Sequence, residues 1–195
     1  PHHEYILLGA GERLGTAWEQ RTLPSLVRAC GAQVLFAPAY TGPVRPPVPM
    51  VLAVHDVSYA AHPEWFGWRE GARRRTTTTL AARAAAAVVT ISHFSKREIA
   101  AHCGVDPDRV AVVYPGITLP GEAPSAAREP RILYVGSVFN RRHVVDLVHA
   151  FDLVAAALPD ARLDLVGHNR THPHLDLSGV IASSRFVDRI AAQEW

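Results

Sequence analysis

The chain has 195 residues, of which 48% are hydrophobic and 19% are charged, and its formal net charge is +2. This apolar content suffices for a substantial core, and the small net charge argues against a nucleic-acid-binding protein, which normally carries a clear basic excess. No apolar run approaches the roughly 18 residues of a membrane-spanning helix, and the opening Pro1–Glu4 is not typical of a secretory signal. Cys30 and Cys103 form no recognisable motif, so we expect free thiols and a cytoplasmic protein.

Short apolar segments alternate along the chain with segments of helical spacing. Strands are predicted where four or five apolar residues follow one another, and helices where apolar residues recur every three or four positions. The predicted strands are residues 5–8, 34–37, 50–54, 88–91, 110–114, 132–135, 163–166 and 189–193. The predicted helices are residues 18–30, 69–87, about 93–104 and about 144–158. This alternation is typical of parallel sheets built from strand–helix–strand units, so the predicted fold class is α/β.

A segment rich in proline and glutamate, residues 119–130, is predicted to be an interdomain linker. It separates an N-terminal Rossmann-like domain, residues 1–118, from a second Rossmann-like domain that begins in residues 131–195. The second part is smaller than the roughly 100 residues of a complete doubly wound domain. We therefore expect the chain to be part of a larger protein, with the first domain lacking its start and the second truncated.

The most informative segment is residues 132–151. A predicted strand ends at Gly136, Ser137 follows it, and Arg141 and Arg142 come just before an amphipathic helix. The free N–H groups and the positive dipole end of a helix attract anions, and arginine can grip phosphate oxygens with paired donors. These four residues are therefore predicted to bind the diphosphate of a nucleotide. A solvated helix start without a ligand is the alternative interpretation.

Several motifs in a fixed order resemble the family 4 glycosyltransferases, which are retaining enzymes with the two-domain fold called GT-B. Each motif is modest alone, but their shared order is specific. They are Trp18-Glu19-Gln20 with Leu23-Pro24; Val54-His55-Asp56 with His62-Pro63-Glu64; Val89 to Lys96; Gly104 to Pro107 and Val113 to Gly116; Leu133 to Gly136 with Arg141-Arg142; Leu165-Val166-Gly167; and Val187 to Ile190.

The resemblance implies transfer of a sugar, with mannose as one candidate, from a nucleotide-sugar donor to a carbohydrate or lipid-linked acceptor. It implies that the arginine pair holds the donor diphosphate and that His55, oriented by Asp56, contacts the donor sugar. No cofactor and no metal are expected, because the arginines would neutralise the leaving group. Ser137 stands where some relatives carry an arginine, and Arg142 takes a position that is usually lysine.

Two further groups of residues have a functional and a structural interpretation. Ser92, Ser95 and Lys96 at a predicted helix start could contact an anion or the acceptor, while capping alone also explains both serines. The arginines of residues 69–75 either face an anionic lipid, which would place the protein at the inner face of the membrane, or form a solvated helix face.

Metal chemistry and two rival functions complete the set of hypotheses. Asp106-Pro107-Asp108 matches the Asp-x-Asp metal motif of another glycosyltransferase fold, but its position between a helix and a strand favours a turn. His168, His172 and His174 favour a polar loop over a zinc site, because no cysteine or carboxylate completes the set. A catalytically inactive, GT-B-like nucleotide-binding or scaffold protein is the main rival to the enzyme. A sugar-nucleotide epimerase of similar fold is the other.

Overall fold

The computed structural model describes residues 15–118, 121 and 129–194. The strand expected at residues 5–8 and most of the linker expected at residues 119–130 lie outside these ranges. The chain forms two compact units, Pro1–Thr118 (unit 1) and Leu119–Trp195 (unit 2). Both units are built on parallel sheets, and α/β is the fold class that the alternating sequence pattern predicts.

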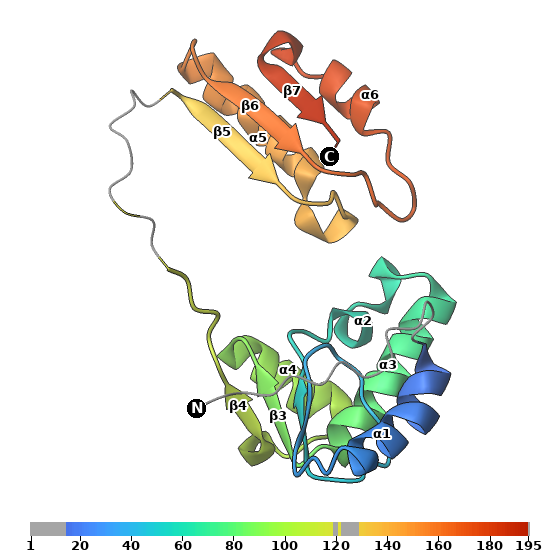
Figure 1. The fold of residues 1–195 in the computed structure, drawn as a ribbon. Coiled ribbons are helices and arrows are strands. Elements are labelled where there is room, and N and C mark those ends of the chain that lie inside the picture. The colour runs from blue at the N-terminus through green and yellow to red at the C-terminus, as the bar shows by residue number, and fades with distance from the viewer. Residues whose placement is uncertain (1–14, 119–120, 122–128, 195) are drawn as a thin grey trace. The chain divides into compact units, whose positions relative to one another are not determined.

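Unit 1 contains a four-stranded parallel sheet in the order β1-β2-β3-β4. Its strands are β1 (Leu35–Ala37), β2 (Met50–Ala53), β3 (Ala87–Thr90) and β4 (Val110–Val112). Its helices are the π-helix η1 (Trp18–Thr22), α1 (Leu23–Ala29), α2 (Ser58–Ala61), η2 (Pro63–Trp65), α3 (Trp68–Ala84), α4 (His93–Cys103) and η3 (Pro107–Arg109). Since crossovers between parallel neighbours are right-handed, α3 and α4 lie on the same face of the sheet (Figure 1).

The core of unit 1 fills the space between this sheet face and the two long helices. Leu52, Val88 and Ile99 are completely buried there. The threonine run of α3 remains helical although threonine is a poor helix former, because Thr78 is 1% exposed in this core. Thr77 Oγ1 also donates to Arg73 O at 2.9 Å, which satisfies its hydroxyl within the helix. Tertiary packing thus overrides the local preference.

Two parts of unit 1 differ from the expectation. The helix predicted over residues 18–30 begins with the five-residue π-helix η1, directly before Pro24 in α1. A proline lacks the N–H that would bond four residues back and its ring crowds that carbonyl, so the wider π turn accommodates it. The segment after β2, expected as a loop, contains α2 and η2. Asp56 initiates α2, since its Oδ1 accepts from Ser58 N at 2.9 Å.

Unit 2 contains a three-stranded parallel sheet in the order β5-β6-β7. Its strands are β5 (Arg131–Val135), β6 (Arg162–Val166) and β7 (Ile190–Gln193). Its helices are η4 (Asn140–Arg142), α5 (Val144–Ala157), α6 (Leu177–Ala182) and η5 (Val187–Arg189). The predicted amphipathic helix is confirmed as α5, which lies behind β5 and β6 in Figure 1 and buries Val148 and Phe151 against Leu163 of β6.

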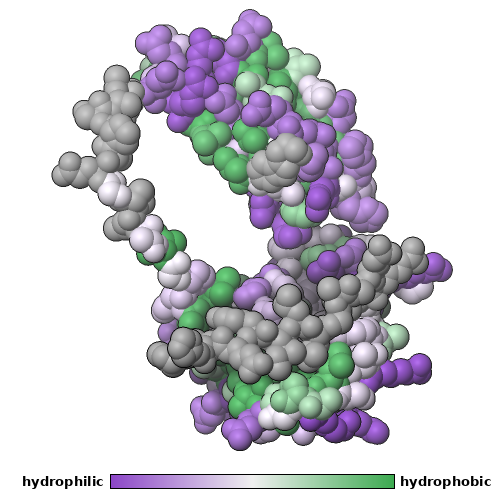
Figure 2. Space-filling model, in the orientation of Figure 1, coloured by the Kyte–Doolittle hydropathy of each residue, from purple (hydrophilic) through white to green (hydrophobic). Residues whose placement is uncertain are grey.

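The opposite face of the unit 2 sheet is open in part. Leu133 and Val135 of β5 are 59% and 58% exposed, and Figure 2 shows hydrophobic surface along this edge of the unit. Among the described residues, none of the helices combines the length and the apolar character that crossing a bilayer requires.

Metal-ligand geometry is absent from the part of the chain that the structure describes, where no three His, Cys, Asp or Glu side chains converge. Asp106 Oδ1 instead accepts from Asp108 N at 2.9 Å and caps η3. The segment Asp106-Pro107-Asp108 therefore forms the turn that its sequence favours.

Candidate functional site

Glycine is required where β5 ends. Gly136 has a φ of +141°, and a β-carbon there would collide with the guanidinium of Arg142. Gly167, which follows β6 with a φ of +149°, approaches Gly136 so closely that its own β-carbon would strike the Gly136 carbonyl. Gly136 N donates to Val166 O at 2.9 Å. The two strand ends therefore meet in a tight junction that no side chain could enter.

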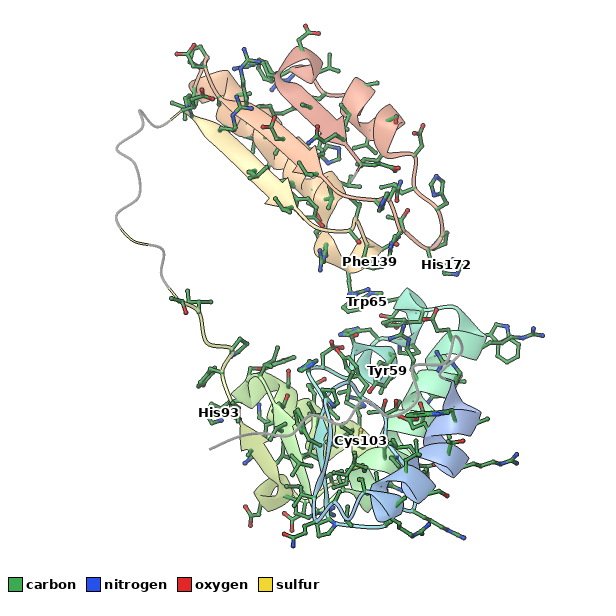
Figure 3. The ribbon with its side chains drawn as sticks, in the orientation of Figure 1. Tyr59, Trp65, His93, Cys103, Phe139 and His172 are labelled. Carbon is green, nitrogen blue, oxygen red and sulfur yellow. The ribbon has the colours of Figure 1, made fainter. Side chains whose placement is uncertain are left out.

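Phe139 carries both arginines of the predicted phosphate site. The guanidinium carbons of Arg141 and Arg142 lie 4.2 Å and 5.7 Å from the centroid of the Phe139 ring. Phe139 is labelled in Figure 3 in the loop that follows β5. Arg142 Nη1 also donates to Ser137 O at 3.2 Å. An aromatic face attracts cations, so the ring and the carbonyl hold two positive charges side by side directly after the Gly136 turn.

The arginines occupy η4, immediately before α5. His143, at a φ of +53°, joins the two helices, and α5 has no side-chain cap at its N-terminus. Asn140 Oδ1 accepts from His172 N at 2.7 Å, which fixes η4 against the loop that follows β6. Two guanidinium groups, a helix N-terminus and a glycine turn therefore lie within one short segment. This arrangement can neutralise a doubly charged anion such as a diphosphate.

His55 follows the buried end of β2 in unit 1 and is half-buried. The ring of Tyr40 lies edge-on to its imidazole, with the centroids 5.4 Å apart and the planes at 89°. Tyr40 Oη donates to Asp56 Oδ2 at 3.0 Å, while Asp56 Oδ1 accepts from the Ser58 N–H and hydroxyl at 2.9 Å and 2.7 Å. Tyr40 thus contacts both of the residues that the sequence singles out as a pair.

The tyrosine loop is held by η1. Thr41 Oγ1 donates to Glu19 Oε1 at 2.8 Å. Gln20 makes two hydrogen bonds, in which its Nε2 donates to Gly42 O at 3.0 Å and its Oε1 accepts from Val44 N at 2.8 Å. The motif Trp18-Glu19-Gln20 therefore has a structural explanation, because two of its side chains hold the loop that presents Tyr40 to His55.

The start of α4 carries the third predicted group. Ser92 Oγ accepts from Ser95 N at 3.0 Å and donates to Ser95 Oγ at 3.1 Å, so Ser92 is a helix cap. Ser95 is 7% exposed, and Lys96 lies in the same turn. Because β2 and β3 are parallel neighbours, α4 begins at the same sheet edge as His55. Capping explains both serines, and a ligand contact by this group stays a prediction.

The predicted residues thus form one group in each unit. Unit 1 holds His55 and Asp56 at one strand end and Ser92, Ser95 and Lys96 at the next. Unit 2 holds Gly136, Ser137, Arg141 and Arg142 in a single turn. Sequence reasoning missed Tyr40 and Phe139. An aromatic residue two positions before an arginine pair was a usable signal for Phe139, whereas nothing in its local sequence marks Tyr40.

Comparison with known proteins gives a family match and several structural neighbours. The sequence model described as Glycosyltransferase Family 4 matches residues 1–119, which include the whole His55 loop. No curated protein matches the chain by sequence. Two of the structural neighbours are crystal structures of HepE from Anabaena. The complex with UDP-glucose has a TM-score of 0.56 at 20% identity over 76% of this chain and 42% of that chain. The complex with UDP and glucose has a TM-score of 0.56 at 16% identity over 94% and 54%.

A third neighbour is a variant of S. aureus TarM in complex with fondaparinux, alpha-GlcNAc-glycerol and UDP. It has a TM-score of 0.58 at 9% identity over 76% of this chain and 29% of that chain. These neighbours are GT-B glycosyltransferases, so the predicted fold class is confirmed. The chain spans between 29% and 54% of the lengths of these three chains.

Proposed function

Because the chain belongs to glycosyltransferase family 4, we propose that the protein transfers a hexose from a nucleoside-diphosphate donor to a carbohydrate or lipid-linked acceptor. The observation that carries this proposal is the arginine pair stacked on Phe139 beside the Gly136 turn. Such a group of fixed positive charges suits the diphosphate of the donor better than a neutral ligand. No metal or other cofactor is needed for this neutralisation.

In the proposed reaction, the bond between the sugar C1 and the diphosphate oxygen breaks, and the acceptor oxygen forms a new bond to C1. Negative charge grows on the departing diphosphate, so Arg141 and Arg142 stabilise the transition state more than the ground state. The acceptor proton passes to the departing phosphate oxygen. His55 hydrogen-bonds to the transferred sugar and holds it while positive charge develops at its ring carbon.

We propose further that the transfer proceeds with retention of configuration, through attack from the face that the diphosphate leaves. The support is the family resemblance. Mannose is the first sugar to test on the same ground, beside glucose, which is the sugar named with the HepE neighbour.

The test uses the full-length protein with GDP-mannose, UDP-glucose and UDP-N-acetylglucosamine as donors. We expect release of nucleoside diphosphate from one of them, and the anomeric configuration of the product is read by proton NMR. His55→Ala is expected to lower kcat about a hundredfold or more, as loss of a positioned group at the reacting centre does. His102→Ala is the matched control, because His102 lies in the last turn of α4, at the opposite edge of the sheet.

The contrary outcome is a protein that neither turns over any donor nor binds GDP or UDP. Binding without turnover would favour the rival, an inactive nucleotide-binding protein. Conversion of the donor sugar in the absence of acceptor would favour an epimerase. Turnover with inversion would contradict the stereochemical part of the proposal alone.

A lipid-linked acceptor is the form that the basic surface of α3 favours. This helix carries five arginines against one glutamate. Trp68, at its start, is 77% exposed, and the Arg69 guanidinium lies 5.1 Å from its ring. Exposed tryptophan and arginine together suit the interface of a membrane with anionic headgroups. We therefore propose peripheral contact of this helix with a lipid surface.

Sedimentation with vesicles tests this contact. The protein is expected to bind vesicles that contain phosphatidylglycerol and not vesicles of phosphatidylcholine alone. The Trp68→Ala variant with Arg69→Gln is expected to lose most of the binding. Arg162→Gln, at the amino end of β6, is the charge-matched control. Equal sedimentation of the two α3 variants with wild type would remove the membrane contact from the proposal.

A further inference from the structure

Tyr40 has an unusual backbone conformation next to the candidate histidine. Its φ is +63°, in the left-handed region that bulky residues rarely adopt. The turn is closed over Tyr40 itself, since Thr41 N donates to Ala39 O at 2.7 Å. A three-residue turn whose central residue has positive φ is rare and strained. A glycine would adopt this conformation without strain, so the tyrosine side chain must contribute something that offsets the cost.

The surroundings hold the turn in place from both sides. Tyr40 N donates to Ala53 O at 2.9 Å, which ties the turn to the end of β2. On the other side, Glu19 and Gln20 make the three hydrogen bonds to residues 41–44 described above. Strained residues persist only where surrounding contacts fix them, and such residues concentrate at functional sites. Here the fixed residue directs its ring at His55 and its hydroxyl at Asp56.

We propose that Tyr40 is a positioning residue for His55, and that η1 with the strained turn forms a clamp that keeps the tyrosine in place. The ring of Tyr40 limits rotation of the imidazole by edge contact. Its hydroxyl donates to Asp56, and Asp56 also accepts two hydrogen bonds from Ser58 at the start of α2. The loop on each side of His55 is therefore fixed by contacts that Tyr40 and Asp56 share.

The inference rests on the proposed function, because positioning matters only if His55 contacts the transferred sugar. A catalytic group that is misplaced by about 1 Å can lose about a hundredfold in rate. The side chain of Tyr40 does not need to contact the substrate for this effect. A role in packing alone would change stability but would not change the turnover of the folded enzyme.

The first experiment is a double-mutant cycle on kcat in the full-length protein. Tyr40→Phe keeps the ring and removes the hydrogen bond to Asp56, whereas Tyr40→Leu removes both contacts. We expect kcat to fall about threefold in Tyr40→Phe and about tenfold or more in Tyr40→Leu, with the donor KM within twofold of wild type. In the His55→Ala background, the same substitutions are expected to have no further effect on kcat, because Tyr40 acts through His55.

The second experiment does not depend on turnover. Proton NMR of the His55 ring, in protein with labelled histidine, reports the ring-current shift caused by the edge contact. We expect this shift in wild type and in Tyr40→Phe, and its loss in Tyr40→Leu. Tyr59→Phe is the matched control in both experiments, since it removes a tyrosine hydroxyl from the buried core of the same unit.

The outcomes separate the two proposals. If no donor is turned over but the ring shift behaves as expected, the proposed function fails while the Tyr40–His55 contact stands. If wild type turns over donor and Tyr40→Leu keeps its full kcat, positioning by Tyr40 is refuted. Equal losses of kcat from Tyr40→Leu with and without His55 would also refute it, because the tyrosine would then act independently of the histidine.

Discussion

The guanidinium of Arg142 occupies the space that a β-carbon at Gly136 would need. The glycine therefore has two reasons to be present, its positive φ and the close approach of the arginine. Arg142 in turn donates to Ser137 O, one residue beyond the glycine. The turn and the charged group thus form one unit, and a change in either residue is expected to alter the other.

Gly136→Ala is expected to destabilise unit 2 and to weaken nucleotide binding together. The alanine must adopt a φ of +141° and displace the Arg142 side chain, and a strained residue of this kind costs about 1–3 kcal/mol. Urea unfolding measures the stability, and isothermal titration with UDP or GDP measures the affinity. Gly116→Ala is the control, since a β-carbon at Gly116 meets no atom within 4 Å. Unchanged stability in Gly136→Ala would show that the turn tolerates an ordinary residue.

Phe139→Leu tests the aromatic platform. Leucine keeps the apolar character but removes the π face under both guanidinium groups. A cation–π contact at an exposed site contributes about 0.5–1 kcal/mol, so the Kd for nucleoside diphosphate is expected to rise about threefold to tenfold. Phe139→Tyr is expected to restore wild-type affinity.

Phe186→Leu is the matched control for the platform. The ring of Phe186 also carries a guanidinium, that of Arg189 at 4.3 Å, but it packs against the core of unit 2 beyond α6. We expect this variant to lose stability with no change in Kd. If Phe139→Leu binds nucleotide as tightly as wild type, the ring does not preorganise the arginines.

Arg142→Lys separates charge from geometry. Lysine keeps the positive charge but lacks the planar fork that can hold Ser137 O and a phosphate oxygen at once. The Kd for nucleoside diphosphate is expected to rise about threefold to tenfold, while the salt dependence of binding stays the same because the charge is unchanged. Titrations at two ionic strengths measure both quantities. Loss of salt dependence with unchanged Kd would contradict this interpretation.

Stability is expected to fall at alkaline pH through Cys103. Burial raises the pKa of this thiol, and the effect exceeds the opposing hydrogen bond from Thr79 and the nearby charge of Arg83. The unfolded thiol ionises near pH ~8.5, and the folded one only at higher pH. The stabilisation is therefore complete below pH ~8.5 and declines as the pH rises above it, because the unfolded chain then binds fewer protons.

The free energy of unfolding, measured from about pH 7 to about pH 10, should decline less steeply in Cys103→Ala than in wild type. Cys30→Ala removes the exposed thiol and is the control. Burial also raises the pKa of Tyr59, which Figure 3 labels in unit 1 together with Cys103, so a decline is expected to remain at higher pH in both variants. Identical profiles for wild type and Cys103→Ala would contradict the assignment.

Regular elements with strong periodicity were predictable from the sequence. The apolar spacing of Val144, Val148 and Phe151 predicted α5, and these residues are buried as expected. The glycine after β5 and the arginines before α5 were predictable for the same reason, since strand ends and helix starts have local signals. The two groups of candidate residues therefore follow from short segments of sequence.

Features that depend on contacts between distant segments were not predictable. The π-helix η1 and the short helix α2 carry weak local signals, because α2 has only four residues. The positive φ of Tyr40 has no local signal at all, since it depends on hydrogen bonds from Glu19, Gln20 and Ala53, which lie 13 to 21 positions away in the printed sequence. Aromatic platforms are likewise visible only when the ring and the cation are seen together.

The hydrogen bonds from Glu19 and Gln20 to residues 41–44 have a practical consequence for chimeric enzymes. Exchanging the proline-rich loop for that of another family member would separate it from the two side chains that shape it. A graft that transfers residues 18–22 along with residues 38–49 keeps both partners of these bonds. The two stretches should be exchanged as a single module even though twelve or more residues lie between them.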